Sequence, residues 1–285
     1  MDLGTALGSG LVNGFALVLV ALGFTIVYRA TGVVNFANGS QMVLGGYVAW
    51  EFGTVAGLPI PLAMAIAVVA GGLSGYVINR FAMRPLQSAS LLSQVIVLLA
   101  ITEVSSTAFL QAFGPEAQAM DPYASRSPVI PALGWSGMDI VLIVIACILV
   151  IALSITLRRS REGLRMRMVA SNRTGAVVVG VNPARTSAIA WTVGGCLAAL
   201  SGALIFPTFL LVPALGQQYT FDSFAAVVLG GFGSFPGAVI GGLLTGVLQA
   251  LVAGQFGGSY GPFVSLGVML VVLLVKPTGL LGKSA

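Results

Sequence analysis

The 285-residue chain is 57% hydrophobic and only 7% charged, with a formal net charge of +5 and a mean hydropathy of +1.02. A soluble domain carries about 25% charged residues because its surface faces water, so this composition excludes one and predicts a polytopic protein in a lipid bilayer. The basic residues stand between apolar runs rather than on one face, so no nucleic-acid partner is expected. There is no histidine, and Cys147 and Cys196 lie inside apolar runs, so neither a metal site, a catalytic nucleophile nor a disulfide framework is predicted.

Six apolar runs approach the roughly 20 residues that a helix needs to cross the bilayer core. They are residues 7–28, 60–77, 91–113, 138–157, 187–211 and 262–275. No positively charged segment precedes the first run, so we expect a retained span rather than a cleaved signal peptide. Two further regions, near 35–47 and 222–246, are interrupted by polar residues, glycine or proline and predict broken or re-entrant helices. The expected fold is all-α, a single transmembrane domain over residues 1–285 with about 7–9 transmembrane helices.

Positive charge predicts the orientation of the chain, because cytoplasmic loops carry the excess of lysine and arginine. Seven arginines lie in the single stretch 158–185, which we place in the cytoplasm as a coupling loop. Alternating spans then bring twelve of the thirteen positive residues to the same side and leave only Arg126 outside. The predicted N-terminus is external, and the predicted C-terminus, with Lys276 and Lys283, is cytoplasmic.

A short internal repeat accompanies the two interrupted regions. Residues 36–47 read FANGSQMVLGGY and residues 221–232 read FDSFAAVVLGGF. Under the predicted topology the two copies run in opposite directions, and inverted repeats with discontinuous helices mark the binding path in transporters. The alternative is that LGG recurs by chance in a chain with 38 glycines.

The stretch AVVLGGFGSFPGAVIGGLLTG, residues 226–246, carries the densest group of glycines. A dinucleotide loop needs G-x-G-x-x-G between a strand and a helix, and both Pro236 and the apolar surroundings exclude it. Gly233, Gly237 and Gly241 instead recur every four residues, which lets another helix approach closely on one face. We predict a close-packed break between two membrane half-helices, with Ser234 capping the second, that either packs the fold or lines a gate.

The loop 158–185 contains a second pattern, in which small and apolar residues alternate from 166 to 179 and Gly180 provides a helix stop. This predicts one short amphipathic helix. Its apolar side chains are small, whereas a helix lying on the membrane surface favours Leu, Phe and Trp, so we expect it to dock on a protein partner. The candidate coupling residues are Arg165, Ala170, Ala176, Val177, Gly180 and Asn182.

Polar residues inside spans are costly and are therefore candidates for function. Glu103 lies near the middle of its span, either on a permeation path or as a protonated or hydrogen-bonded glutamate facing another helix. Asn35, Asn38 and Gln41 either satisfy the interrupted second span or contact the solute, and Asp222 is expected at the outer end of a half-helix. The candidate residues of a path or gate are Asn35, Asn38, Gln41, Glu103, Ser105, Asp222, Gly231, Gly233 and Gly237.

Four segments occur in a fixed order: GFTIVYRATGVVNFANGSQMVLGGYV, REGLRMRMVASNRTGAVVVGVNPAR, AVVLGGFGSFPGAVIGG and KPTGLLG. With them the chain resembles the LivH-like permeases of branched-chain amino acid ABC importers, over essentially its whole length. The resemblance implies a bacterial plasma-membrane subunit that pairs with a second, LivM-like permease, two ATP-binding cassette subunits and an extracytoplasmic solute-binding protein. It also implies that the coupling loop contacts an ATPase. Asn38 stands where the family commonly has histidine, and Glu103 where it has small residues.

These features predict a permease subunit that forms half of the path for a small amino-acid-like solute, with a branched-chain amino acid favoured. The chain has no Walker-type lysine loop, so ATP and magnesium are expected in partner chains and no cofactor in this one. The alternative is a stand-alone channel or secondary transporter for a small solute such as urea or a short amide. A membrane enzyme is disfavoured by the missing catalytic groups.

Overall fold

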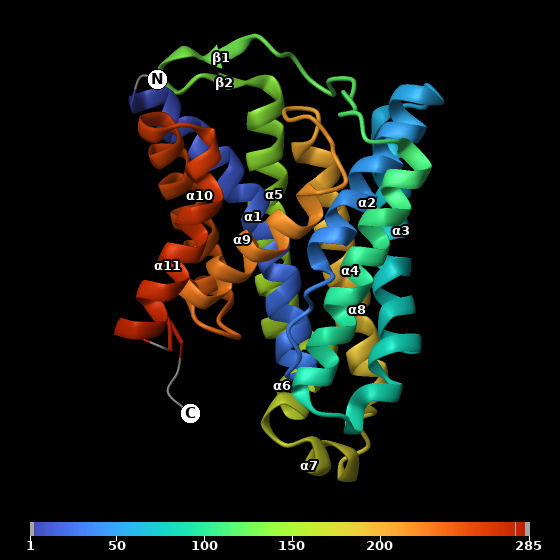
Figure 1. Cartoon of the computed structure of the whole chain (residues 1–285). Helices are drawn as coiled ribbons and strands as arrows, with labels where there is room; N and C mark the ends of the chain where they lie inside the picture. Colours follow the sequence, from blue (N-terminus) through green and yellow to red (C-terminus); the bar gives the residue numbers. More distant parts are fainter. Residues whose placement is uncertain (1–2, 277, 283–285) are drawn as a thin grey trace.

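The computed structural model describes residues 3–276 and 278–282, and within them the chain is a bundle of helices (Figure 1). In chain order the helices are α1 (Leu3–Thr31), α2 (Asn38–Trp50), α3 (Ile60–Val77), α4 (Leu91–Phe113), α5 (Gly137–Arg159), α6 (Arg161–Ser171), α7 (Arg173–Val178), α8 (Pro183–Ile205), α9 (Leu215–Gly230), α10 (Phe235–Phe256) and α11 (Gly261–Val275). Two π-helical segments, Glu51–Val55 and Ile78–Met83, extend α2 and α3. Strands β1 (Pro128–Ile130) and β2 (Trp135–Ser136) pair antiparallel.

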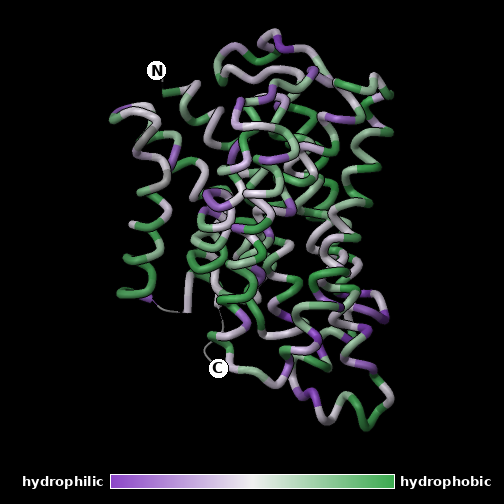
Figure 2. Tube along the Cα trace, turned by 45° about the vertical axis from the view of Figure 1, so that its right-hand side comes forward, coloured by the Kyte–Doolittle hydropathy of each residue, from purple (hydrophilic) through white to green (hydrophobic). Residues whose placement is uncertain are grey.

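The predicted fold class is confirmed. Six of the described helices are long and apolar enough to cross a membrane, and α2, α9 and α11 are shorter. The runs predicted at 60–77 and 91–113 coincide with α3 and α4. Figure 2 shows hydrophobic residues along the outer helices, with hydrophilic residues at the two ends and within the bundle. Cys147 and Cys196 are free thiols.

Helix α1 forms the centre of the bundle, and its most apolar stretch is 83% buried. It packs against α10 and α8, and α8 also packs against α2 and α3. Glycine permits these close approaches: a Cβ added at Gly246 of α10 would overlap the backbone of Gly14 in α1. Helices without a hydrophobic driving force between them associate through such small residues. The glycine spacing seen in the sequence therefore has a packing role.

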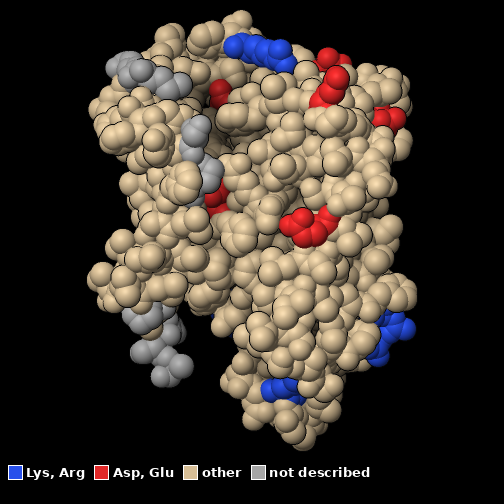
Figure 3. All heavy atoms as spheres, in the orientation of Figure 1, with Lys and Arg blue, Asp and Glu red and all other residues tan. Residues whose placement is uncertain are grey.

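The two ends of the molecule differ in charge. The N-terminus and the β1–β2 hairpin lie at one end, and α6, α7 and the C-terminus lie toward the other (Figure 1). On the face drawn in Figure 3, Lys and Arg gather at the α6–α7 end apart from one patch beside the hairpin. Residues 158–185 and residue 126 thus stand at opposite ends, as predicted. Which end faces the cytoplasm stays a prediction.

The helical boundaries correct four predictions. The one helix predicted within 166–179 is divided between α6 and α7, because the Asn172 side chain accepts a hydrogen bond of 2.8 Å from the Gly175 amide and starts a new helix. The span predicted at 187–211 begins at Pro183 and ends at Ile205, where Pro207 disfavours further helix. Helix α10 has 22 residues and is a full-length span rather than a half-helix.

The fourth correction concerns the repeat. The interruption before α2 is the non-helical stretch 32–37, and α2 is then regular from Asn38. Gly45 and Gly46 lie inside α2, where a Cβ would overlap Ala199 of α8 and the Phe206 ring just after α8, whereas Gly230 is the last residue of α9. The two LGG sequences therefore occupy different structural positions, and only the second precedes a break.

Candidate functional site

The starts of α2 and α9 meet inside the bundle. The Gly39 amide donates to the Thr220 hydroxyl oxygen at 3.1 Å. The Thr220 hydroxyl donates to the Gly216 carbonyl oxygen of its own helix at 2.8 Å and also lies 3.3 Å from the Phe36 carbonyl oxygen. A Cβ on Gly39 would overlap the Gly216 carbonyl oxygen, so only glycine permits this approach. We call the contact between residues 35–41 and 216–220 the helix junction. It lies beside the middle of α1, since Asn38 Nδ2 donates to the Val20 carbonyl oxygen at 2.8 Å.

Neither helix at the junction is capped by the residue that precedes it, and in α2 the Thr220 hydroxyl accepts from the first-turn amide of Gly39 instead. The residues before their first turns are Ala37 and Ala214, which offer no side-chain acceptor to the first amides. An α-helix has a partial positive charge at its N-terminus. Two such ends near the middle of a membrane domain produce a local field that favours an anionic group, as in transporters whose interrupted helices hold a substrate carboxylate.

The three predicted amide side chains lie together at the junction. Asn35 and Asn38 are fully buried and Gln41 is 2% exposed. Asn35 Nδ2 donates to Gln41 Oε1 at 3.1 Å and to Asn38 Oδ1 at 3.4 Å, and Gln41 Nε2 donates to Ser74 Oγ at 3.2 Å. In this conformation the three side-chain amides form hydrogen bonds with one another, and Asn35 Oδ1 also accepts from the Ala37 backbone amide in the non-helical stretch before α2. Contact with a solute stays a prediction.

Sequence reasoning missed two threonines of the junction. Thr220 bridges α2 and α9, and the Thr102 hydroxyl of α4 donates to the Phe36 carbonyl oxygen at 3.0 Å. Glu103, one residue further along α4, is exposed on the outer face of the helix, and Ser105 is half-buried. Glu103 therefore points away from the other described helices. Thr102 and Glu103 are neighbours on α4, and the rotation of the helix about its axis decides which of the two side chains faces the bundle. The sequence contains no signal for that rotation.

The prediction that Asp222 lies at the outer end of a half-helix is wrong, because the residue lies in the middle of α9. It is 3% exposed, and its Oδ1 accepts a hydrogen bond of 2.6 Å from Ser265 of α11. Ser265 accepts from Gln249 Nε2 at 2.7 Å, and Gln249 Oε1 accepts from Asn13 Nδ2 of α1 at 2.9 Å. This polar chain joins α9, α11, α10 and α1. Because burial of a carboxylate is costly, the chain of donors explains how Asp222 is tolerated there.

The predicted break between α9 and α10 spans residues 231–234. Gly231 and Gly233 have φ of +100° and +72°, which other residues rarely adopt. The Ser234 side chain accepts from the Gly237 amide at 3.2 Å and caps α10, as predicted. A Cβ on Gly237 would overlap the Gly230 carbonyl oxygen, so this glycine permits backbone packing. A gating role for these residues stays a prediction.

The last turn of α9 is completed by the segment after α11. The Leu280 and Leu281 amides donate to the carbonyl oxygens of Leu229 and Gly230 at 2.8 and 3.0 Å. The final carbonyls of a helix lack partners within the helix itself. The KPTGLLG segment supplies partners here, which gives this sequence motif a structural role.

The coupling residues occupy the end of the bundle formed by α6 and α7. Ala176 is buried, whereas Val177, Val178 and Val179 are exposed by 56%, 82% and 64%. Arg165 pairs with Glu162 on α6, and Ala170 is exposed. Gly180 has φ of +80° and ends the segment after α7, and the Asn182 side chain caps α8. The exposed valines form the tip of this end, and two of them lay outside the predicted set.

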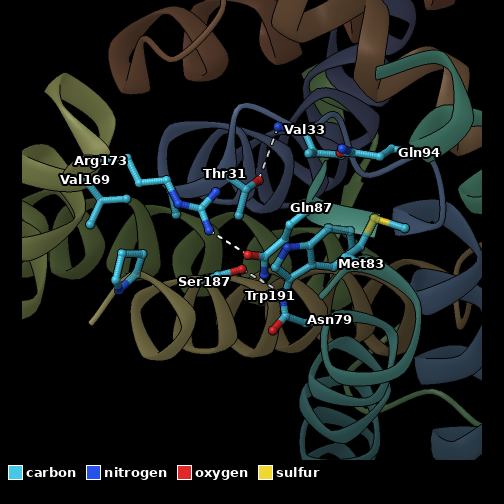
Figure 4. Close-up of a pocket in the computed structure, with 12 residues that line it drawn as sticks. Thr31, Val33, Asn79, Met83, Gln87, Gln94, Val169, Arg173, Ser187 and Trp191 are labelled. Carbon is cyan, nitrogen blue, oxygen red and sulfur yellow. Dashed lines mark hydrogen bonds between the residues drawn. The ribbon is translucent and has the colours of Figure 1, made fainter. Parts of the chain in front are cut away.

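A small polar cavity of about 50 Å³ separates α7 from the membrane-spanning helices (Figure 4). Arg173 of α7 donates to Gln87 Oε1 at 2.6 Å, and Asn79 Nδ2 donates to Ser187 Oγ at 2.6 Å. The Trp191 indole lines the same cavity, and its buried Nε1 has no hydrogen-bond partner among the described residues. Through Arg173, the coupling end is attached to the segment between α3 and α4.

Interrupted helices that meet near the middle of a membrane-spanning bundle define a transporter-type membrane protein. The chain belongs to the family described as branched-chain amino acid transport system / permease component, whose model matches residues 6–273. It is thus a permease, a transport component rather than a catalytic protein.

Two curated relatives are similar over nearly the whole chain. BraD of Pseudomonas aeruginosa, a high-affinity branched-chain amino acid transport system permease protein, is 31% identical over 96% of this chain and 94% of its own length. LivH of Escherichia coli, of the same description, is 30% identical over the same shares. A solved chain of PsaBC from Streptococcus pneumoniae shares the fold with a TM-score of 0.52 at 14% identity, covering 95% of this chain and 91% of that one.

Proposed function

We propose that the chain forms half of the translocation path of an ATP-driven importer for a small amino-acid-like solute, with a branched-chain amino acid as the favoured solute. The helix junction carries this proposal. Two helix N-termini meet beside the middle of α1, where their dipoles provide positive potential for a carboxylate. The names of BraD and LivH point to the same class of solute.

The partners follow from the surfaces of the chain. The exposed valines 177–179 suit docking on a cytoplasmic ATP-binding cassette subunit, two of which would bind ATP and magnesium. An extracytoplasmic solute-binding protein would deliver solute at the hairpin end. In this orientation α6, α7 and the C-terminus are cytoplasmic, and the N-terminus is external.

The outer face of α4 suits a second, related permease such as a LivM-like subunit. Glu103, Thr107 and Gln111 are exposed at helical spacing and form a polar stripe from the middle of α4 toward the hairpin end. An ionisable side chain at this depth is costly in lipid. The stripe would therefore face the second permease and the path between the two subunits.

Reconstitution tests the proposal. The tagged chain is purified from its native membrane with its associated subunits and placed in proteoliposomes with the binding protein. We expect ATPase chains to copurify in fixed ratio and leucine uptake to require both ATP and magnesium. The solute class is tested in parallel with urea, a short amide and an aromatic amino acid, because Asn38 and Glu103 differ from the residues that the family commonly has at these positions. Uptake by the purified chain alone, driven by an ion gradient or by leak, would contradict the proposal and favour a secondary transporter or channel.

A further inference from the structure

A basic cavity of about 500 Å³ lies at the α6–α7 end of the bundle. Arg29 of α1, Arg158 of α5 and Arg167 of α6 all line it, and residues 232–236 before and at the start of α10 form another wall. None of the residues that line the cavity is acidic. Three positive charges, two of them on exposed side chains, thus share one cavity without an acidic residue on its walls, and their positive potential attracts an anion.

The arginines are only partly satisfied within the chain. The half-buried Arg29 guanidinium lies 5.3 Å from the centroid of the Phe235 ring, and none of the described residues accepts a hydrogen bond from it. Arg167 donates to the carbonyl oxygens of Gly163 and Arg158. The one ion pair among the described residues joins Arg165 to Glu162, neither of which lines the cavity. Arg29 in particular can still donate to an external anion.

An aliphatic stripe on α5 leads to the same cavity. Val144, Ile148, Ile151 and Ile155 are 49–59% exposed and follow one another at intervals of four, three and four residues. Arg158 comes three residues later and continues the same face. Only 11% of the most apolar stretch of α5 is buried within the chain. The site therefore combines a long apolar track with a basic end, which matches the shape of an amphiphile.

We propose that this cavity binds the phosphodiester headgroup of an anionic phospholipid, with an acyl chain along the α5 stripe. The shared chemistry is a phosphate anion, which the planar guanidinium groups bind through paired N–H donors. The apolar stripe and the position at the membrane boundary select a lipid over free phosphate, and basic pockets between membrane helices are known to bind such headgroups. This site is separate from the helix junction and does not depend on the proposed solute.

Lipid binding to the purified full-length chain tests the inference. Native mass spectrometry counts bound phosphatidylglycerol and phosphatidylcholine, and thermal unfolding in nanodiscs of either lipid gives a second measurement. The test variant is Arg158→Gln/Arg167→Gln. The matched control is Arg159→Gln/Arg161→Gln, which removes the same charge from the same two helices outside the cavity. A third arm adds inorganic phosphate to the protein in neutral detergent.

We expect wild type and control to retain phosphatidylglycerol in preference to phosphatidylcholine, and the test variant to bind it about tenfold more weakly. An equal unfolding temperature of both variants in phosphatidylcholine shows that the test variant is folded. An equal loss of phosphatidylglycerol binding in the test and control variants would show that binding depends only on net charge and would overturn the site. Stabilisation by inorganic phosphate as strong as by the lipid would assign a soluble anion instead. Unchanged phosphatidylglycerol binding by the test variant would show that Arg158 and Arg167 do not hold the headgroup and would overturn the site.

Discussion

The Gly39 amide and the Thr220 hydroxyl oxygen lie 3.1 Å apart, although 181 residues separate them in the chain. This bond joins the first turn of α2 to the second turn of α9, and the Thr220 hydroxyl also lies within hydrogen-bond distance of the Phe36 carbonyl oxygen. A conformational change that separates the two helices must break both bonds. Opening of the proposed path at the junction therefore costs the free energy of these hydrogen bonds, and a mutation that removes them measures that free energy.

Replacement of Thr220 by valine removes the hydroxyl and keeps the shape. The buried Gly39 amide then loses its acceptor, so we expect a stability loss of about 1–3 kcal/mol, measured as a lower unfolding temperature in detergent. Thr245→Val is the matched control, because the Thr245 hydroxyl is buried without a partner among the described residues and its removal should be neutral or stabilising. Equal destabilisation by the two substitutions would contradict the role of the junction bond.

Gly237→Ala tests whether the α9–α10 break packs the fold. The added Cβ overlaps the Gly230 carbonyl oxygen, so we expect about 1–3 kcal/mol of destabilisation and reduced assembly with partner subunits. Gly267→Ala in α11 is the control, since a Cβ there meets no atom within 4 Å. Normal stability and assembly of Gly237→Ala with loss of transport would instead assign this glycine to a gate.

The Arg173–Gln87 bond gives a test of coupling. If α7 transmits ATPase movement through this bond, Arg173→Ala and Gln87→Ala should each lower solute-stimulated ATP hydrolysis by about fivefold or more. The double variant should be no worse than either single one. Arg80→Ala removes an exposed arginine from the segment that extends α3, outside this bond and outside the coupling residues, and should leave the stimulation unchanged. Additive effects of Arg173→Ala and Gln87→Ala would show that the two residues act separately.

The polar stripe on α4 predicts contact with water in the assembled transporter. In a background with Cys147 and Cys196 replaced by alanine, Thr107→Cys should react with a membrane-impermeant maleimide. Ile148→Cys on the α5 stripe should react only with a lipid-soluble reagent, because its face is aliphatic. The measurement is the labelling rate of each cysteine by mass spectrometry. A Thr107→Cys site that only the lipid-soluble reagent reaches would place the stripe against lipid.

Much of the fold follows from local chemistry. Apolar length predicts the spans over 60–77 and 91–113, and Gly231 and Pro236 predict the break before α10, because positive φ and a missing donor are properties of single residues. The Asn172 break also has a local cause, the side-chain cap on α7, but it was not predicted, because an asparagine side chain can lie within a helix or cap a new one.

The composition of the site was less predictable. Asn35, Asn38 and Gln41 do lie together, because they belong to one interrupted segment. Thr220 and Asp222 depend on how α9 is placed against α2 and α11, and such tertiary contacts leave no periodic signal in one sequence. Glu103 shows the same limit, since the sequence fixes its depth in the membrane and only the packing of α4 fixes its direction.

Helix α9 is held at both ends by segments far from it in the chain: Thr220 near its start contacts α2, and Leu280 and Leu281 bond its last carbonyls. The helix therefore connects the helix junction to the C-terminal segment, and a movement at one end is transmitted to the other. A spectroscopic label on that segment would therefore report displacements of a buried helix from the exposed end of the chain that bonds it.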